Sequence, residues 1–235
     1  MFLKYCWPNV LARSSLLYQA DVAVYLNPAD QERRKEAVSI LQDTFVNHHL
    51  TIYLRENEVY NTGAVMAMYE AVSSNFFDGY DWVIRLNPDV MIRDDTFLRE
   101  NMVDPTVSAL LVNCRNRGAK VHTDFFVIRP NVLDANLFTE QIVQKNAEQG
   151  FTSLLQDTVL SKGTHRWIPD TNPKTSACRA GDHRDYYESP IVHEHGTFLF
   201  FVFRFDIFFG WPNLLCLLQL CTPISAQFLR VILIL

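Results

Sequence analysis

The residues with the clearest chemical meaning lie in the segment Asp81–Asp95, DWVIRLNPDVMIRDD. Asn87, Pro88 and Asp89 separate an apolar run typical of a buried strand from a second short apolar run. Asn-Pro-Asp is a favourable turn sequence, because its side chains hydrogen-bond the local backbone. A carboxylate at the end of a buried strand is also well placed to bind a hard cation such as Mg²⁺ or Mn²⁺. Both interpretations stay open from this segment alone, and the two acids that close it are expected to cap the next helix.

Strand and helix patterns alternate in the first half of the chain. Apolar residues at alternate positions predict strands, and apolar residues at helical spacing predict helices. In chain order the predicted elements are strand 20–27, helix 28–45, strand 50–54, helix 61–75 and strand 81–86. This alternation is typical of parallel βαβ units, so we expect an α/β fold with helices on a layered sheet. Asn87 and Asp89 then follow the third strand, at the edge where open α/β sheets bind ligands.

The second half is less regular. Strands predicted at 107–113 and 123–130 have no helix pattern between them, which indicates that the sheet becomes mixed. A helix is predicted over 131–150, with Gly150 as its C-cap, and a shorter one over 153–163. A polar, loop-like stretch follows and leads into IVHEHG at 191–196.

Charge and motif content exclude several classes of protein. The net charge is −5 with both signs interspersed, which provides no basic surface for nucleic acid. The five cysteines are scattered and include no CxxC pair, so neither a zinc site nor a disulfide framework is predicted. No stretch matches GxGxxG or a P-loop, which disfavours a nucleotide-binding protein that depends on a glycine-rich phosphate loop.

The C-terminal part has a different composition from the rest. Residues 207–229 contain no charge, which meets the length criterion for a membrane span, but they include prolines and amides that are unfavourable in lipid. An anomalous terminus, a membrane segment and a buried core segment all remain open. We therefore predict an α/β domain over 1–196 and a separate hydrophobic tail over 197–235.

The order of motifs over 16–196 resembles that of the GT-A-fold, nucleotide-sugar-dependent glycosyltransferases. In that family an Asp-x-Asp motif ends a buried strand and is followed by another short apolar run; here Asn87 stands at the first acid and Asp89 at the second. The resemblance implies a Rossmann-related mixed sheet flanked by helices. It also places a further strand before 20–27, where the sequence leaves little room, so we expect an N-terminally truncated domain that lacks this first strand.

The resemblance also implies roles for single residues. Asp89 would bind a divalent cation, Mn²⁺ or Mg²⁺, together with the late histidines His195 and His193. Further implied roles are contact with the nucleotide-sugar for Asn87, Asp124 and Arg85, and catalysis as general base for Asp157 of LLQDTVL. Each residue has a plainer alternative: a turn, a strand-start acid, an exposed helical acid or a solvated histidine.

The predicted function is the metal-dependent transfer of a hexosyl or pentosyl group from a nucleotide-sugar to an acceptor hydroxyl on a glycan or glycoprotein. The alternative is a catalytically silent relative that serves as a binding or scaffold protein. A nucleotidyltransferase and a membrane-associated structural protein are two other classes to weigh. The resemblance implies work in the secretory pathway, in the Golgi, and membrane association would rest on 207–229. Retention and inversion of stereochemistry both fit these residues.

Overall fold

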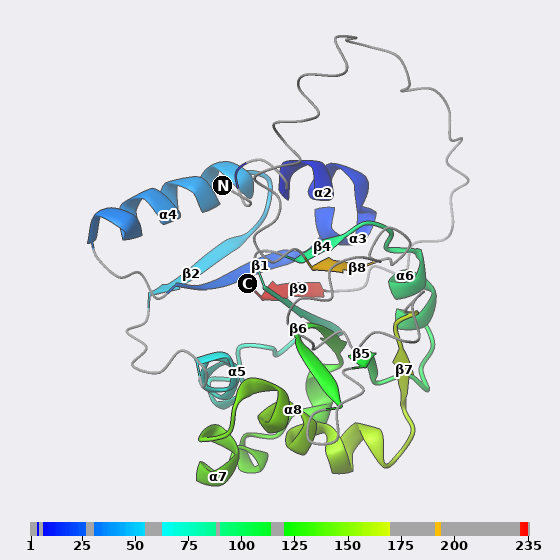
Figure 1. Cartoon of the computed structure of the whole chain (residues 1–235). Helices are drawn as coiled ribbons and strands as arrows, with labels where there is room; N and C mark the ends of the chain where they lie inside the picture. Colours follow the sequence, from blue (N-terminus) through cyan, green and yellow to red (C-terminus); the bar gives the residue numbers. More distant parts are fainter. Residues whose placement is uncertain are drawn as a thin grey trace.

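A seven-stranded sheet runs through the centre of the computed structural model, with helices on both of its faces (Figure 1). The structure describes residues 4, 7–26, 31–54, 63–87, 90–113, 120–169, 191–193 and 231–234. The strand order is β2-β1-β9-β3-β6-β5-β7. The predicted fold class, a layered mixed α/β sheet flanked by helices, is confirmed.

The strands begin and end close to the positions that the sequence predicts. Those of the main sheet are β1 Asp21–Leu26, β2 Leu50–Leu54, β3 Trp82–Leu86, β5 Ala109–Asn113, β6 Val121–Ile128, β7 His165–Trp167 and β9 Val231–Ile234. A separate two-stranded ladder joins β4 Val90–Ile92 to β8 Ile191–His193. Strands β2, β1, β9 and β3 are parallel, whereas β6 is antiparallel to both β3 and β5. The predicted change to a mixed sheet in the second half is therefore confirmed.

Helices cover the two faces of the sheet with two apolar cores. Their bounds are α2 Trp7–Arg13, α3 Ser15–Tyr18, α4 Gln31–Thr44, α5 Gly63–Ser73, α6 Thr96–Met102, α7 Glu140–Val143 and α8 Ala147–Leu155. Trp7, Leu41 and Leu98 of α2, α4 and α6 are buried in the core on one face. Val65 of α5 and Phe151 of α8 belong to the core on the other face, below the sheet in Figure 1. The alternating side chains of the strands supply both cores.

The strand between β1 and β3 comes from the C-terminal part of the chain. β9 pairs in parallel with both neighbours and is drawn in red in Figure 1. Its sequence, VILI, is the continuous apolar run expected of a central parallel strand. Among the described residues before β1, the chain forms helices and no strand, so β9 takes a central position that no N-terminal segment described here occupies.

Four residues of the predicted hydrophobic tail thus belong to the sheet. The uncharged run 207–229 lies outside the described residues. Within the described ranges, no helix is both long enough and apolar enough to cross a membrane.

The predicted helix over 131–150 is wrong. The chain forms two 3₁₀ turns, Pro130–Val132 and Ala135–Leu137, before α7 and α8. Local hydrogen bonds compete with a continuous helix here: Oδ1 of Asp134 accepts the Asn136 N–H at 2.8 Å in the second 3₁₀ turn, and the Asn146 side chain accepts the Gln149 N–H at 3.0 Å where α8 begins. Gly150 is not a C-cap but lies inside α8, where a Cβ would stand 3.1 Å from Cγ2 of Val65. The glycine therefore allows α8 to approach α5 closely.

Candidate functional site

The candidate site begins where β3 ends. Asn87 directly follows this strand, and its backbone N–H donates to the carbonyl oxygen of Asp124 at 2.9 Å. The side-chain Nδ2 of Asn87 also donates to Oδ1 of Asp124 at 2.7 Å. Two residues predicted to contact the nucleotide-sugar are thus brought together, by a pair of hydrogen bonds between β3 and β6.

An irregularity in β6 places Asp124 there. Leu111 pairs with Phe126 and Asn113 with Val121, so a single residue of β5 faces the four β6 residues 122–125. A bulge of this kind turns side chains out of the regular ladder, and bulges are common next to active sites. The segment that carries Asp124 is therefore released from β5 at the point where it meets the end of β3.

Two cationic or titratable groups adjoin Asp124. Arg85, the third predicted contact residue, donates through a guanidinium nitrogen to the backbone carbonyl of Thr123 and lies 4.0 Å from Oδ1 of Asp124. Its side chain is only 14% exposed, so this position is fixed by the surrounding strands. His122 accepts the Asp124 N–H on Nδ1 at 3.1 Å, and the same nitrogen lies 3.7 Å from Oδ2 of Asp124. A nitrogen that accepts carries no proton, so this hydrogen bond requires the His122 tautomer whose proton is on Nε2.

Helix α8 brings a second carboxylate to the residue that precedes Asp124. Thr123 donates its hydroxyl hydrogen to Oε1 of Glu148 at 3.1 Å. One turn further on, Oγ1 of Thr152 accepts the N–H groups of Lys120 at 3.0 Å and Val121 at 3.2 Å. The first turns of α8 are therefore attached to the start of β6, at the same edge of the sheet as Asn87.

Asp157 lies away from this cluster. It is exposed on the π-helical turn Gln156–Leu160 that follows α8. In the same turn the Val159 carbonyl accepts the Thr164 N–H, and the Thr164 carbonyl accepts the N–H of Ser108, which precedes β5. Because β5 begins at the edge of the sheet opposite to the end of β3, Asp157 and Asp124 lie toward opposite edges. The structure does not bring these two predicted site residues together.

The segments predicted to bind a metal ion meet through the small β4–β8 ladder. In its register Val90 pairs with His193, so the late histidine segment lies opposite the residue that follows Asp89. Asp89 and His195, and the side chain of His193, fall outside the described residues. In the ranges that the structure does describe, no group of three or more His, Cys, Asp or Glu could hold a metal ion. The ladder places β4, which follows Asp89 in the chain, beside β8, which ends at His193, and carboxylate ligands suit Mg²⁺ or Mn²⁺.

The two acids after β4 have different partners. Asp94 accepts the Thr96 N–H on Oδ1 at 2.9 Å, and the Thr96 hydroxyl and N–H hold the pKa of Asp94 below its usual value. Asp95 is the N-cap residue of α6, but its carboxylate makes no cap bond there and instead accepts the Ser14 hydroxyl at 2.8 Å and Nε of Arg99 at 2.8 Å. The predicted local bond is made by Asp94, while Asp95 attaches β4 and α6 to the N-terminal helices.

Sequence reasoning did not find His122 or Glu148. The sequence could have indicated His122, because residues two apart in a strand face the same side and Asp124 was already a candidate. Glu148 had none, because an acid in the first turn of a helix is common and does not indicate which strand the helix covers.

No family model matches the sequence, and no curated protein matches it at a significant level. The solved structures that are similar include a glycosyltransferase involved in the glycosylation of the major capsid of PBCV-1, with a TM-score of 0.44, 12% identity, and coverage of 76% of this chain and 95% of that chain. They also include a cytidylyltransferase from Leptospira borgpetersenii serovar Hardjo-bovis, with a TM-score of 0.42, 11% identity, and coverage of 74% of this chain and 67% of that chain. These distant likenesses concern the arrangement of helices and strands, and they add no argument about activity.

Proposed function

We propose that this chain is a metal-dependent glycosyltransferase that moves a hexosyl or pentosyl group from a nucleotide-sugar to an acceptor hydroxyl. The observation that supports the proposal most is the pairing of Val90 with His193. It brings β4, which directly follows the Asn87–Asp89 segment, against the late histidine segment, although the two are separated by nearly half of the chain. The Asp124 cluster at the end of β3 gives this place polar groups that a sugar could contact.

In this proposal a divalent cation held by Asp89, with His195 or His193, would stabilise the negative charge that develops on the departing diphosphate. Asn87 supplies no charge, and its amide nitrogen donates to Asp124. Its side-chain oxygen would accept a hydrogen bond from a ribose or sugar hydroxyl. Arg85 and Asn87 fix the direction of the Asp124 carboxylate, which would accept further hydroxyl hydrogens.

The acceptor hydroxyl needs a base if the transfer inverts the sugar. Of the two carboxylates at issue, Glu148 is better placed than Asp157, because Thr123 links it to the segment that contains Asp124. Substituting a general base lowers kcat by about 10²–10⁴-fold. Glu148→Gln should therefore slow transfer to the acceptor by that factor and Asp157→Asn should not, while the reverse result would return the role to Asp157.

The acceptor class and the cellular compartment rest on the resemblance alone. A glycan or glycoprotein acceptor, work in the Golgi, and membrane association through 207–229 are accordingly part of the proposal and have no support from the described residues.

The proposal is tested by hydrolysis of the donor. Purified full-length chain is incubated with UDP-, GDP- and CMP-linked sugars, with and without Mn²⁺, and the released nucleotide is measured. We expect release that requires Mn²⁺ and is lost in Asp89→Ala. Asp78→Ala is the matched control, since Asp78 is an exposed acid in the turn after α5.

The outcomes separate the two functions. Nucleotide-dependent thermal stabilisation without hydrolysis or transfer would favour the catalytically silent binding protein. No hydrolysis and no thermal shift with any of these nucleotides would refute both.

A further inference from the structure

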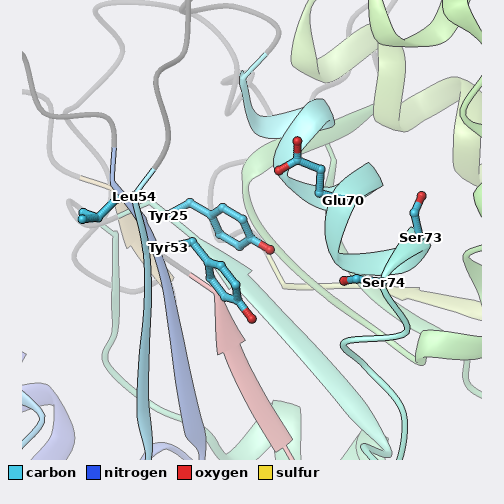
Figure 2. Close-up of a pocket in the computed structure, with 6 residues that line it drawn as sticks. All are labelled: Tyr25, Tyr53, Leu54, Glu70, Ser73 and Ser74. Atoms are coloured by element: carbon cyan, nitrogen blue, oxygen red, sulfur yellow. The ribbon is translucent and has the colours of Figure 1, made fainter.

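A cavity lies between the edge of the sheet and α5, on the face away from α4. Tyr25 and Tyr53 pair across β1 and β2, and their rings stack with centroids 4.8 Å apart and an interplanar angle of 15°. Phe76 meets the Tyr53 ring edge-to-face at 5.4 Å. The cavity measures about 380 Å³ and is lined by Tyr25, Tyr53, Leu54, Glu70, Ser73 and Ser74 (Figure 2).

The polar groups of this cavity stand out against the composition of α5. The helix has the sequence GAVMAMYEAVS, and apart from Tyr69 its polar residues are Glu70 and Ser73, both of which line the cavity. Ser74, directly after the helix, donates its hydroxyl hydrogen to the Ala71 carbonyl at 3.2 Å, which leaves its lone pairs to accept. Figure 2 shows the tyrosine rings extending from the strands toward this side of the helix.

This combination suits one class of ligand. Stacked aromatic rings offer a flat apolar surface with two phenol hydroxyls, and binding cavities of small molecules combine such surfaces with a few polar groups. Hydroxyls on both sides and one carboxylate match a ligand that donates and accepts through many hydroxyl groups. The Glu70 carboxylate disfavours anions such as phosphate.

We propose that this cavity binds a neutral saccharide ring, with one ring face against the Tyr25–Tyr53 pair and hydroxyl groups bonded to Glu70, Ser73 and Ser74. Burial raises the pKa of Tyr53, so its phenol stays protonated and can donate.

The cavity is separate from the candidate site at the end of β3. The strands that carry Tyr25 and Tyr53, β1 and β2, are two and three strand spacings from β3 in the sheet order, roughly 10 and 14 Å, which a single sugar ring does not span. The saccharide site therefore does not depend on donor, metal ion or transfer activity, and its test can fail or succeed independently of the proposed function.

The test measures the binding of methyl glycopyranosides of glucose, galactose, mannose and xylose to the full-length chain. Binding is detected by saturation-transfer NMR in the absence of metal ions. We expect transfer to the ring protons of at least one glycoside. Tyr53→Ala should weaken its binding about fivefold, since an aromatic contact contributes about 1 kcal/mol. Tyr53→Phe keeps the ring and should weaken binding less than Tyr53→Ala does.

Two further variants distinguish a loss of binding from a loss of folding. Ser73→Leu fills the cavity from the exposed end of α5 without changing a strand, and should abolish binding with an unchanged thermal transition. Tyr18→Ala removes a 60% exposed tyrosine elsewhere and should leave binding intact. Absence of saturation transfer for all four glycosides would overturn the proposal. So would binding that survives both Tyr53→Ala and Ser73→Leu, or binding of uridine and cytidine in place of the glycosides.

Discussion

Replacing Asp95 by alanine tests how β4 is held in place. The Asp95 side chain is 7% exposed and accepts three hydrogen bonds: from the Ser14 hydroxyl at 2.8 Å, the Leu16 N–H at 3.2 Å and Nε of Arg99 at 2.8 Å. Ser14 is itself 4% exposed, so the variant leaves buried donors without an acceptor, at about 1–3 kcal/mol each. Arg99 is about half exposed and can be rehydrated, so its share is small.

The expected loss of unfolding free energy is therefore about 3 kcal/mol. For a chain of this length that corresponds to a fall in Tm of about 6–12 °C, since 1 kcal/mol shifts Tm by about 2–4 °C. Urea unfolding followed by circular dichroism measures the free energy, and a thermal scan measures Tm. A double-mutant cycle of Asp95→Ala with Ser14→Ala should give a coupling of about 1–2 kcal/mol, because the two side chains bond directly.

Asp94→Ala is the matched control, because Asp94 is the neighbouring acid but is exposed and bonds only to Thr96 in the contacts described. It should cost no more than about 0.5–1 kcal/mol. Equal losses in the two variants, or a coupling to Ser14 near zero, would refute the reasoning that the buried carboxylate links the N-terminal helices to α6.

Three further predictions test other parts of the structure. Burial lowers the pKa of His165 in the folded protein below its usual value of 6.5. The neutral side chain therefore contributes fully to the unfolding free energy above about pH 6.5, and this contribution is lost as the pH falls through the pKa of the folded state. His165→Gln should flatten the decline of the urea-unfolding free energy at acid pH, and parallel curves for the variant and the wild type would contradict this. Removing 231–235 takes away the strand between β1 and β3 and should abolish the cooperative thermal transition, whereas an unchanged Tm would contradict the placement of β9. In Asn87→Asp, the new carboxylate would lie against the Asp124 carboxylate, where Asn87 now donates a hydrogen bond at 2.7 Å. Because like charges repel, Tm should fall in the absence of a cation, and Mn²⁺ should raise Tm more than it does in the wild type. An equal effect of Mn²⁺ on both proteins would count against a cation site here.

Local patterns sufficed for the first half of the fold. The strand predicted at 50–54 is β2 over the same residues, because its apolar and β-branched side chains and the flanking polar segments are all local signals. The interrupted region before α8 was not predictable in the same way. Helical spacing continued across it, but the side chains of Asp134 and Asn146 each accept a backbone N–H two or three residues later, and these local bonds compete with a continuous helix.

Pairing between strands that are distant in the chain could not be predicted from local sequence patterns. β9 is four apolar residues whose partners, β1 and β3, lie far away in the chain, and no local feature indicates that pairing. The bulge in β6 likewise arises from its register with β5. The pairing of Asn87 with Asp124 agrees with the predicted order of motifs, whereas the place of Asp157 depended on the direction of α8, which the order of motifs does not define.

The proposed function requires that the Asn87–Asp89 segment and the late histidines form a metal-dependent nucleotide site. The most direct test is calorimetric titration of the full-length chain with UDP and GDP, with Mn²⁺ or with EDTA, for the wild type, Asp89→Asn and the control Asp78→Asn. We predict that at least one nucleotide binds only with Mn²⁺, and that Asp89→Asn weakens this binding at least about 10–100-fold, since that is the loss when only an outer-shell partner of a metal ligand is removed. Equal affinity with Mn²⁺ and with EDTA, or equal affinity in wild type and Asp89→Asn, would contradict the claim.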